Sequence, residues 1–198
     1  MTTQPRPPFY IIRHGETDWN REKRYQGQVD IPLNALGRRQ AADNGRFLAT
    51  RGHGWSGWRF FSSPLGRARE TMEILRAEMG LTPDDYTVDD RLIEITFGDW
   101  ERKRLDELEV EDPAEMDRRH ANKWEHVPPG GESYAQAVDR VQAFLDELDG
   151  PSVVVCHGGI LRAVQYLMGE TDTQSLANAP VPQDRLFIHD GTHSFWSE

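Results

Sequence analysis

The chain has 198 residues, of which 37% are hydrophobic and 28% charged, a formal net charge of −10 at pH 7 and a single cysteine. This length predicts a single domain, and the acidic balance argues against bulk attraction to nucleic acid or to an anionic membrane. One cysteine excludes an intrachain disulfide and a multi-cysteine zinc site. Residues 1–8 form a Pro-rich tail, predicted to be flexible, without the apolar region of a signal peptide, and no run is long enough to span a membrane. We therefore expect a cytoplasmic protein.

Short apolar runs alternate with amphipathic segments along the chain. Strands are predicted at 9–12, 58–62, 152–156, 185–189 and 193–197, the last two joined by a turn at Asp190-Gly191, with a weaker candidate at 87–92. Helices are predicted at 34–51, 65–79, 133–148 and 157–169. Residues 99–131, rich in charge, proline and glycine, are predicted to form a helical cap inserted over the main body. This alternation predicts an α/β protein, a three-layer α/β/α sandwich with a mostly parallel central sheet.

Unusual residues follow several of these strands. Arg13 and His14 come after the first, Arg67 closely follows the second, and His157 follows the 152–156 run. Glu94 lies just after the weaker strand candidate. Ligands bind beyond the carboxyl ends of the strands in such sheets, so neighbouring strands would bring two arginines, two histidines and a carboxylate to one cavity.

This set of side chains suits phosphoryl transfer. Arg13 and Arg67 can each donate paired hydrogen bonds to a phosphoryl group. Nearby cations disfavour a charged imidazole, so His14 can stay neutral and attack phosphorus, giving a phosphohistidine. His157, if protonated, could share the growing negative charge, and Glu94 could give a proton to the leaving oxygen and later take one from water.

Glycines after the last of these strands fit the same chemistry. Gly158 and Gly159 stand at the start of a predicted helix, where backbone N–H groups and the helix dipole favour an anion.

These residues lie in blocks that resemble the signature of the histidine phosphatase superfamily, the phosphoglycerate-mutase-like fold. The blocks occur in the family's order and extend over residues 9–168: Arg13-His14-Gly15-Glu16-Thr17, Ser63-Pro64-Leu65 with Arg67, Leu92-x-Glu94 followed by Phe97-Gly98-Asp99-Trp100-Glu101, Pro129-Gly130-Gly131-Glu132-Ser133 and His157-Gly158-Gly159. The resemblance implies His14 as the phosphorylated nucleophile, Arg13, Arg67 and His157 as phosphate ligands, and Glu94 as proton donor. It also implies further phosphate contacts from Asn20, Gln26, Gly27 and Gly158.

The resemblance implies a substrate and a cofactor requirement as well. The family chemistry needs no metal and no other cofactor, and the expected partner is a small phosphorylated metabolite, with the protein either a monomer or a homodimer. The layout of Trp100, Trp124 and the Pro-Gly-Gly-Glu-Ser block is similar to that of small bacterial phosphatases, including α-ribazole phosphatase. The chain lacks the larger insertion of the cofactor-dependent phosphoglycerate mutases. We therefore expect a phosphomonoester hydrolase, with a mutase and a non-catalytic phospho-ligand-binding module as alternatives.

Two further features leave alternatives open. Cys156 and Arg162 have the spacing of cysteine-dependent phosphatases, but we interpret Cys156 as a buried small hydrophobe and Arg162 as structural. Related phosphatases often have glycine after the glutamate that is Glu101 here, whereas this chain continues Arg102-Lys103-Arg104. These cations either attract a second anionic group of the substrate or, as we prefer, form a solvated face.

Overall fold

The computed structural model describes residues 6–51 and 54–198, so most of the predicted tail lies outside the described residues. The strands and helices in chain order are β1 (Phe9–Arg13), α1 (Asp18–Arg21), α2 (Ala35–Ala49), β2 (Arg59–Ser62), α3 (Gly66–Glu78), β3 (Thr87–Val88), α4 (Leu105–Glu111), α5 (Pro113–Ala121), α6 (Tyr134–Asp146), β4 (Ser152–Cys156), α7 (Gly158–Leu167), α8 (Thr173–Asn178), β5 (Leu186–His189) and β6 (Ser194–Trp196), with 3-10 turns η1 (Asp90–Leu92) and η2 (Gly98–Trp100). Within these two ranges, no helix combines the length and apolar character that a membrane crossing requires.

The strands form one sheet in the order β3-β2-β4-β1-β5-β6. Strands β3, β2, β4 and β1 run parallel, and β5 and β6 complete the sheet as an antiparallel pair. Strand β4 lies between β1 and β2 and is buried along its whole length, as its continuous apolar sequence predicts. The carboxyl ends of β2, β4 and β1 therefore lie next to one another at the same edge.

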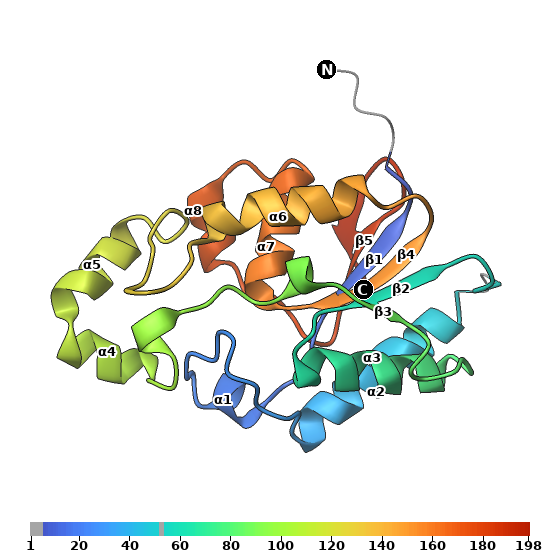
Figure 1. The fold of residues 1–198 in the computed structure, drawn as a ribbon, viewed down its shortest axis with the longest axis horizontal. Coiled ribbons are helices and arrows are strands. Elements are labelled where there is room, and N and C mark those ends of the chain that lie inside the picture. Colours follow the sequence, from blue (N-terminus) through green and yellow to red (C-terminus); the bar gives the residue numbers. More distant parts are fainter. Residues whose placement is uncertain (1–5, 52–53) are drawn as a thin grey trace.

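Two helical layers cover the sheet (Figure 1). Side chains alternate between the two faces of each strand, so Phe9 and Ile11 pack in the cluster beneath α6 and α7. Tyr10 and Ile12 pack on the opposite side, in the cluster beneath α2 and α3. The predicted three-layer α/β/α sandwich with a mostly parallel sheet is confirmed.

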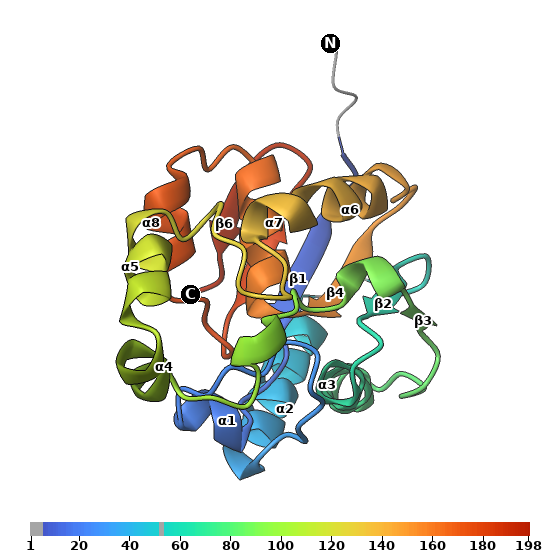
Figure 2. The same cartoon turned by 60° about the vertical axis from the view of Figure 1, so that its left-hand side comes forward.

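The range predicted as a helical cap holds η2, α4 and α5. It has a small apolar cluster of its own, formed by Trp100, Leu108 and Met116. Figure 2 shows α4 and α5 on one side of the molecule, with α1 below them and α8 beside α5.

Several local predictions differ from the structure. The strand predicted at 87–92 is only the two residues of β3, because the Asp89 side chain accepts the Arg91 N–H and turns the chain into η1. Helices α1 and α8 were not predicted, since both are too short for a hydrophobic period. The predicted hairpin is confirmed, but its loop spans residues 190–193 because His189 pairs with Ser194.

The N-terminus of helix α3 is capped by a residue from a distant loop. Its N-cap residue, Leu65, has no side-chain acceptor, and Asp30 instead accepts from the backbone N–H groups of Gly66 at 2.7 Å and Arg67 at 3.4 Å. Replacing an N-cap acceptor by alanine typically costs about 1 kcal/mol.

We therefore expect Asp30→Ala to lower the free energy of unfolding by about 1 kcal/mol, because the first turn of α3 loses its acceptor. Asp30→Asn keeps an acceptor oxygen and should lose less. Urea denaturation of both variants measures the difference. Equal losses in the two variants would contradict the capping role.

Candidate active site

The ends of three neighbouring strands place the predicted residues side by side. Pairing continues one step beyond the strands, because His14 N–H donates to the Cys156 carbonyl at 2.9 Å and Ser63 N–H donates to the Val155 carbonyl at 3.0 Å. The rings of His14 and His157 consequently lie 5.1 Å apart between centroids. Strand order alone thus brings the two sequence-distant histidine blocks together.

A cavity of about 180 Å³ opens beyond these strand ends. Its lining residues are Arg13, His14, Asn20, Arg24, Tyr25, Gln26, Gly27, Arg67, Glu94, Phe97, Tyr134, Gly158, Gly159 and Arg162. Every predicted site residue except His157 is among them. His157 is fully buried next to the His14 ring rather than on the cavity surface.

The hydrogen bonds of His14 fix its tautomer. Its Nδ1 lies 2.8 Å from the Gly15 carbonyl, which can only accept, so Nδ1 carries the proton. The Arg67 Nε–H, which can only donate, points to Nε2 at 3.3 Å. Nε2 of this buried, neutral imidazole is therefore unprotonated, and its lone pair accepts from Arg67.

The surroundings of both histidines favour their neutral forms. Burial first, and then the charges of Arg67 and Arg13, hold the pKa of His14 well below its ordinary value of about 6.5. Burial, Arg67, His14 and Arg13 lower the pKa of His157 in the same way. A protonated His157 is thus disfavoured, and this side chain is better suited to act as a neutral hydrogen-bond donor.

The two predicted arginines are held by backbone carbonyls. Arg67 is buried and donates from Nη2 to the Gly27 carbonyl at 2.7 Å and from Nη1 to the Val29 carbonyl at 2.8 Å. Arg13 donates from Nη1 to the Val181 carbonyl at 2.7 Å. Burial lowers the pKa of Arg13 to about 10, which leaves the guanidinium charged at neutral pH.

Buried nitrogens of Arg13 and His157 still lack a partner. Arg13 Nε and His157 Nδ1 make no hydrogen bond among the described residues. The other ring nitrogen of His157 lies 2.6 Å from the Ser63 hydroxyl, which can donate to it and leave the proton on Nδ1. Unpaired buried donors are costly, and these two belong to cavity-lining Arg13 and to His157, the neighbour of cavity-lining His14. An anion that accepted from them would remove that cost.

Glu94 reaches the cavity from a loop and not from a strand end as predicted, because β3 stops at Val88 and η1 intervenes. Both of its carboxylate oxygens accept from the Gly159 N–H, at 3.1 and 3.2 Å, and Oε1 also accepts from the Ile95 N–H at 3.0 Å. A Cβ at position 159 would lie 2.5 Å from Oε1. Gly159 therefore leaves room for the carboxylate of Glu94 at the start of α7, and the Gly159 N–H is already bonded to that carboxylate.

The amide side chains of Asn20 and Gln26 are oriented by their neighbours. Asn20 Oδ1 accepts from the Thr17 N–H and from Gln183 Nε2, both at 3.1 Å. Gln26 Oε1 accepts from Thr17 Oγ1 at 2.9 Å. With their oxygens occupied, both cavity-lining amides keep N–H groups for a ligand.

Sequence reasoning missed part of this site. Gln183 also donates to the His14 carbonyl at 3.0 Å, and nothing in its Pro-rich segment signals that role. Thr17 and Asn20 form a capping box at α1, a signal visible in their spacing. The aromatic lining residues Tyr25, Phe97 and Tyr134 come from three separate segments.

Arg162 lines the cavity but is also a structural residue, as predicted. It donates to the backbone carbonyls of Gly158 at 3.2 Å, Leu176 at 3.2 Å and Ala179 at 2.7 Å. These bonds attach the end of α8 to the start of α7.

The structure distinguishes between the alternatives for two other features. Cys156 is fully buried in the core, and burial raises the pKa of its thiol, so it is not a reactive nucleophile. Lys103 pairs with Glu111 at 2.7 Å and Arg104 with Asp106 at 2.9 Å, and neither cation lines the cavity. Arg102 does not line it either.

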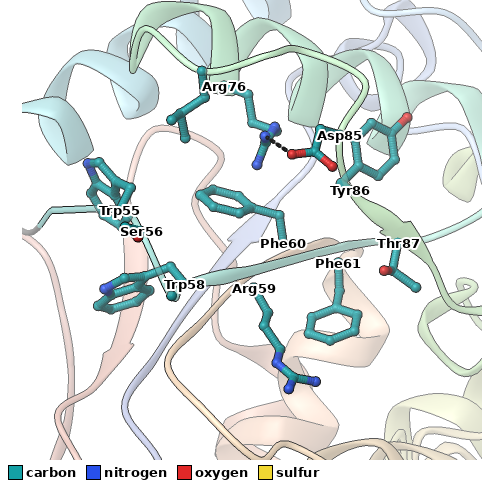
Figure 3. A pocket seen from close by; sticks show the side chains of 12 residues that line it. Trp55, Ser56, Trp58, Arg59, Phe60, Phe61, Arg76, Asp85, Tyr86 and Thr87 are labelled. Carbon is teal, nitrogen blue, oxygen red and sulfur yellow. Dashed lines mark hydrogen bonds and ion pairs between the residues drawn. The ribbon is translucent and has the colours of Figure 1, made fainter.

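Neither a metal site nor a larger neighbouring hollow coincides with these residues in the described part of the chain. In the described ranges 6–51 and 54–198, no group of three or more His, Cys, Asp or Glu side chains could hold a metal ion. A larger hollow of about 820 Å³ lies beside β2 and β3, lined by Trp55, Trp58, Phe60, Tyr86 and others. Figure 3 shows Arg76 there, paired with Asp85 at 3.4 Å beside the Phe60 ring. None of the predicted site residues lines this hollow.

Comparison with known proteins places this geometry in a family. The histidine phosphatase superfamily (branch 1) matches residues 9–196. The "Probable phosphoglycerate mutase GpmB" of Salmonella paratyphi C is 38% identical over 136 residues, which is 69% of this chain and 60% of that protein. The chain thus spans less than two thirds of the length of such relatives.

Solved structures agree with this match. The mycobacterial glucosyl-3-phosphoglycerate phosphatase Rv2419c, solved with VO3, has a TM-score of 0.77 at 28% identity, covering 96% of both chains. An Escherichia coli K-12 protein proposed to be an alpha-ribazole-5'-P phosphatase has a TM-score of 0.76 at 26% identity, covering 97% of this chain and 95% of its own. The chain belongs to branch 1 of the histidine phosphatase superfamily.

Proposed function

We propose that this protein hydrolyses phosphomonoesters of small metabolites through a phosphohistidine at His14 Nε2, without a metal ion or other cofactor in the reaction. One observation carries the proposal: a buried, neutral histidine whose Nε2 is unprotonated lines a cavity that Arg13, Arg67 and Glu94 also line. These residues supply the nucleophile, the phosphate-binding cations and the proton donor that a nucleophilic phosphoryl transfer needs.

In the first half-reaction, the guanidinium groups of Arg13 and Arg67 bind the phosphoryl oxygens and orient phosphorus toward Nε2. The Arg67 Nε–H turns from Nε2 to a phosphoryl oxygen, and the released Nε2 lone pair forms the bond to phosphorus while the bond from phosphorus to the leaving oxygen breaks. Glu94, protonated, gives its proton to that oxygen, so the alcohol leaves neutral. His14 then carries the phosphoryl group, and its Nδ1–H remains bonded to the Gly15 carbonyl.

In the second half-reaction, water replaces the departed alcohol. Glu94, now a carboxylate, takes a proton from the water as its oxygen bonds to phosphorus, and the bond from phosphorus to Nε2 breaks. Inorganic phosphate leaves and His14 returns to its starting state. The same carboxyl group thus acts first as acid and then as base.

Further donors stabilise the charge that develops on the transferred group. The free N–H groups of Asn20 and Gln26 and the Nδ1–H of His157 supply hydrogen bonds without adding charge. Gly158 starts α7 at the cavity, where its backbone N–H favours an anion.

The cavity favours a small substrate. Its volume of about 180 Å³ is below the roughly 300 Å³ of ordinary small-molecule pockets. It suits a phosphoryl group with a compact leaving group, and a larger metabolite would extend past Tyr25, Phe97 and Tyr134. The phosphatase names and VO3 complex among the structural neighbours support a phosphoryl-transfer site. We propose no nucleic-acid or membrane partner, and either a monomer or a homodimer as the working form.

A mutase is the second candidate, because several relatives carry a phosphoglycerate mutase name. The two activities share the phosphohistidine and differ in whether water or a second hydroxyl accepts the phosphoryl group. The phosphatase names among the structural neighbours favour water as the acceptor.

The phosphohistidine can be trapped directly. Acid-sensitive, base-stable radiolabel from a phosphomonoester is expected on the wild-type protein and not on His14→Gln, because the variant has no imidazole nucleophile. Cys156→Ser should keep full labelling and turnover, since that thiol is buried away from the cavity. Labelled His14→Gln would exclude His14 as the acceptor, and a wild type with neither label nor turnover would indicate a binding module.

A panel of phosphorylated metabolites with a chelator present separates phosphatase from mutase. We expect phosphate release from several members, unaffected by the chelator, and little isomerisation of 3-phosphoglycerate. Faster isomerisation than phosphate release would identify a mutase. Loss of activity with the chelator, restored by a divalent metal, would contradict the metal-independent reaction.

The acid limb of the pH profile should depend on Arg67. The Arg67 charge helps to hold the pKa of His14 low, so Arg67→Gln should raise that pKa toward about 6.5 and move the acid limb of kcat/KM to higher pH. Imidazole NMR titration measures the same pKa directly. Arg46→Gln, at an exposed ion pair, is the matched control and should leave the titration unchanged. An unaltered His14 titration in Arg67→Gln would contradict this electrostatic role.

A further inference from the structure

One oxygen of Glu101 joins two loops that form different walls of the cavity. Glu101 Oε1 accepts from the Gln28 N–H at 3.0 Å, from the Thr96 hydroxyl at 2.9 Å and from the Phe97 N–H at 3.1 Å. Glu101 itself does not line the cavity. Hydrogen bonds to a carboxylate are stronger than those to a neutral oxygen, so this junction is a firm one.

Each loop carries part of the proposed chemistry. The first includes Gln26 and Gly27, and the Gly27 carbonyl holds the Nη2 of Arg67 at 2.7 Å. The second carries Glu94, and the Gln28 side chain adds a second tie by donating to the Glu94 carbonyl at 3.1 Å. The separation between the acid and the phosphate-binding arginine therefore depends on these ties.

The first loop is shaped to meet this carboxylate. Gly27 has φ +51°, and a Cβ there would lie 2.0 Å from Glu101 Oε1. A side chain at position 27 would thus displace Glu101 as well as strain the backbone.

The other side of the acid loop is fixed independently. Arg140 on α6 donates to the carbonyls of Arg91 at 2.6 Å and Ile93 at 2.7 Å, and it forms a paired contact with Glu132. The Glu132 N–H donates in turn to the Thr96 carbonyl at 2.8 Å. Loss of Glu101 would therefore weaken the link between the acid loop and the Gln26–Gly27 side, where the Gln28 bond to the Glu94 carbonyl would remain, while α6 still held the acid loop.

We propose that Glu101 is a positioning residue, which sets the place of the Glu94 carboxyl group relative to the leaving oxygen by fixing the acid loop to the phosphate-binding loop. This inference rests on the proposed function, since it assigns Glu101 to the proton-transfer step. Glu101 acts through its acceptor oxygen, so Glu101→Gln should keep the positioning function and Glu101→Ala should lose it.

A comparison of rates for substrates with different leaving groups tests this positioning role. An alkyl phosphate needs a proton on its departing oxygen, whereas p-nitrophenolate leaves without one. Misplacement of a catalytic group by about 1 Å can cost on the order of 10²-fold in rate. In Glu101→Ala, kcat/KM for glycerol phosphate should fall by roughly that factor, and kcat/KM for p-nitrophenyl phosphate only a few-fold.

The experiment compares kcat/KM for both esters in wild type, Glu101→Ala, Glu101→Gln and Glu94→Gln. The expected result is a selective loss with the alkyl ester in Glu101→Ala, matching the direction seen in Glu94→Gln, and near-native values in Glu101→Gln. Glu111→Gln removes a carboxylate of the helical cap that pairs with Lys103, away from the cavity, and should change kcat/KM for neither ester. Equal losses on both esters, no loss, or an alanine-like Glu101→Gln would overturn the proposal.

The Gln28→Ala variant and the activity of the wild type keep the test decisive. If Glu101→Ala fails to fold, Gln28→Ala removes only an exposed side chain and its bond to the Glu94 carbonyl. It should show the same selectivity to a smaller degree, and an unselective loss would overturn the role. A wild type that neither hydrolyses the esters nor becomes phosphorylated would refute the proposed function itself, whereas an active wild type with unselective variants would refute only the role of Glu101.

Discussion

The site depends on the contact between the Arg67 guanidinium and the Nε2 atom of His14. A cation that only donates can approach an imidazole nitrogen only if that nitrogen keeps its lone pair. The Gly15 carbonyl holds the ring's one proton on the other nitrogen. Burial and the arginine charges disfavour a second proton, so the ring is prepared as a nucleophile before any ligand arrives.

That contact exists because of the strand order. Strand β4 lies between β1 and β2, so residues more than 140 positions apart in sequence, His14 and His157, become neighbours. Arg67 then reaches His14 from the start of α3, which Asp30 caps from a separate loop. Parallel pairing thus puts the chemistry at one edge, and the loops adjust its distances.

Much of this arrangement could be predicted from the sequence. The apolar run at 152–156 indicated a central strand, and the residues after the strands indicated where the site would lie. Short or polar elements could not be predicted in the same way, because α1 and α8 depend on local caps such as Thr17 and Asp172 and not on a hydrophobic period. The position of Glu94 was also missed in detail, since one aspartate-capped turn after β3 moved it from a strand end to a loop.

Tertiary contacts explain the remaining site features that the sequence did not predict. Gln183 supports both His14 and Asn20 although its flanking prolines suggest only an irregular segment. The Pro-Gly-Gly-Glu-Ser block is identifiable as a family motif, but its use is visible only in three dimensions. A Cβ at Gly98 would lie 2.1 Å from the Pro129 carbonyl, and one at Gly131 would lie 2.8 Å from the Thr96 carbonyl, so this turn packs closely against the loop that carries Glu94.

The choice of hydrogen-bond acceptors explains how an acidic protein keeps a cationic cavity. Lys103 and Arg104, on the surface, are paired with carboxylates of their own loop and helix. Arg13 and Arg162 are instead held by backbone carbonyls, which orient a guanidinium without cancelling its charge. Arg67 is held in the same way, and it also pairs with the half-exposed Asp30 at 3.6 Å. Three oriented guanidinium charges around a cavity with one lining carboxylate, Glu94, are best balanced by a multiply charged anion such as a phosphoryl group, whatever the net charge of the chain.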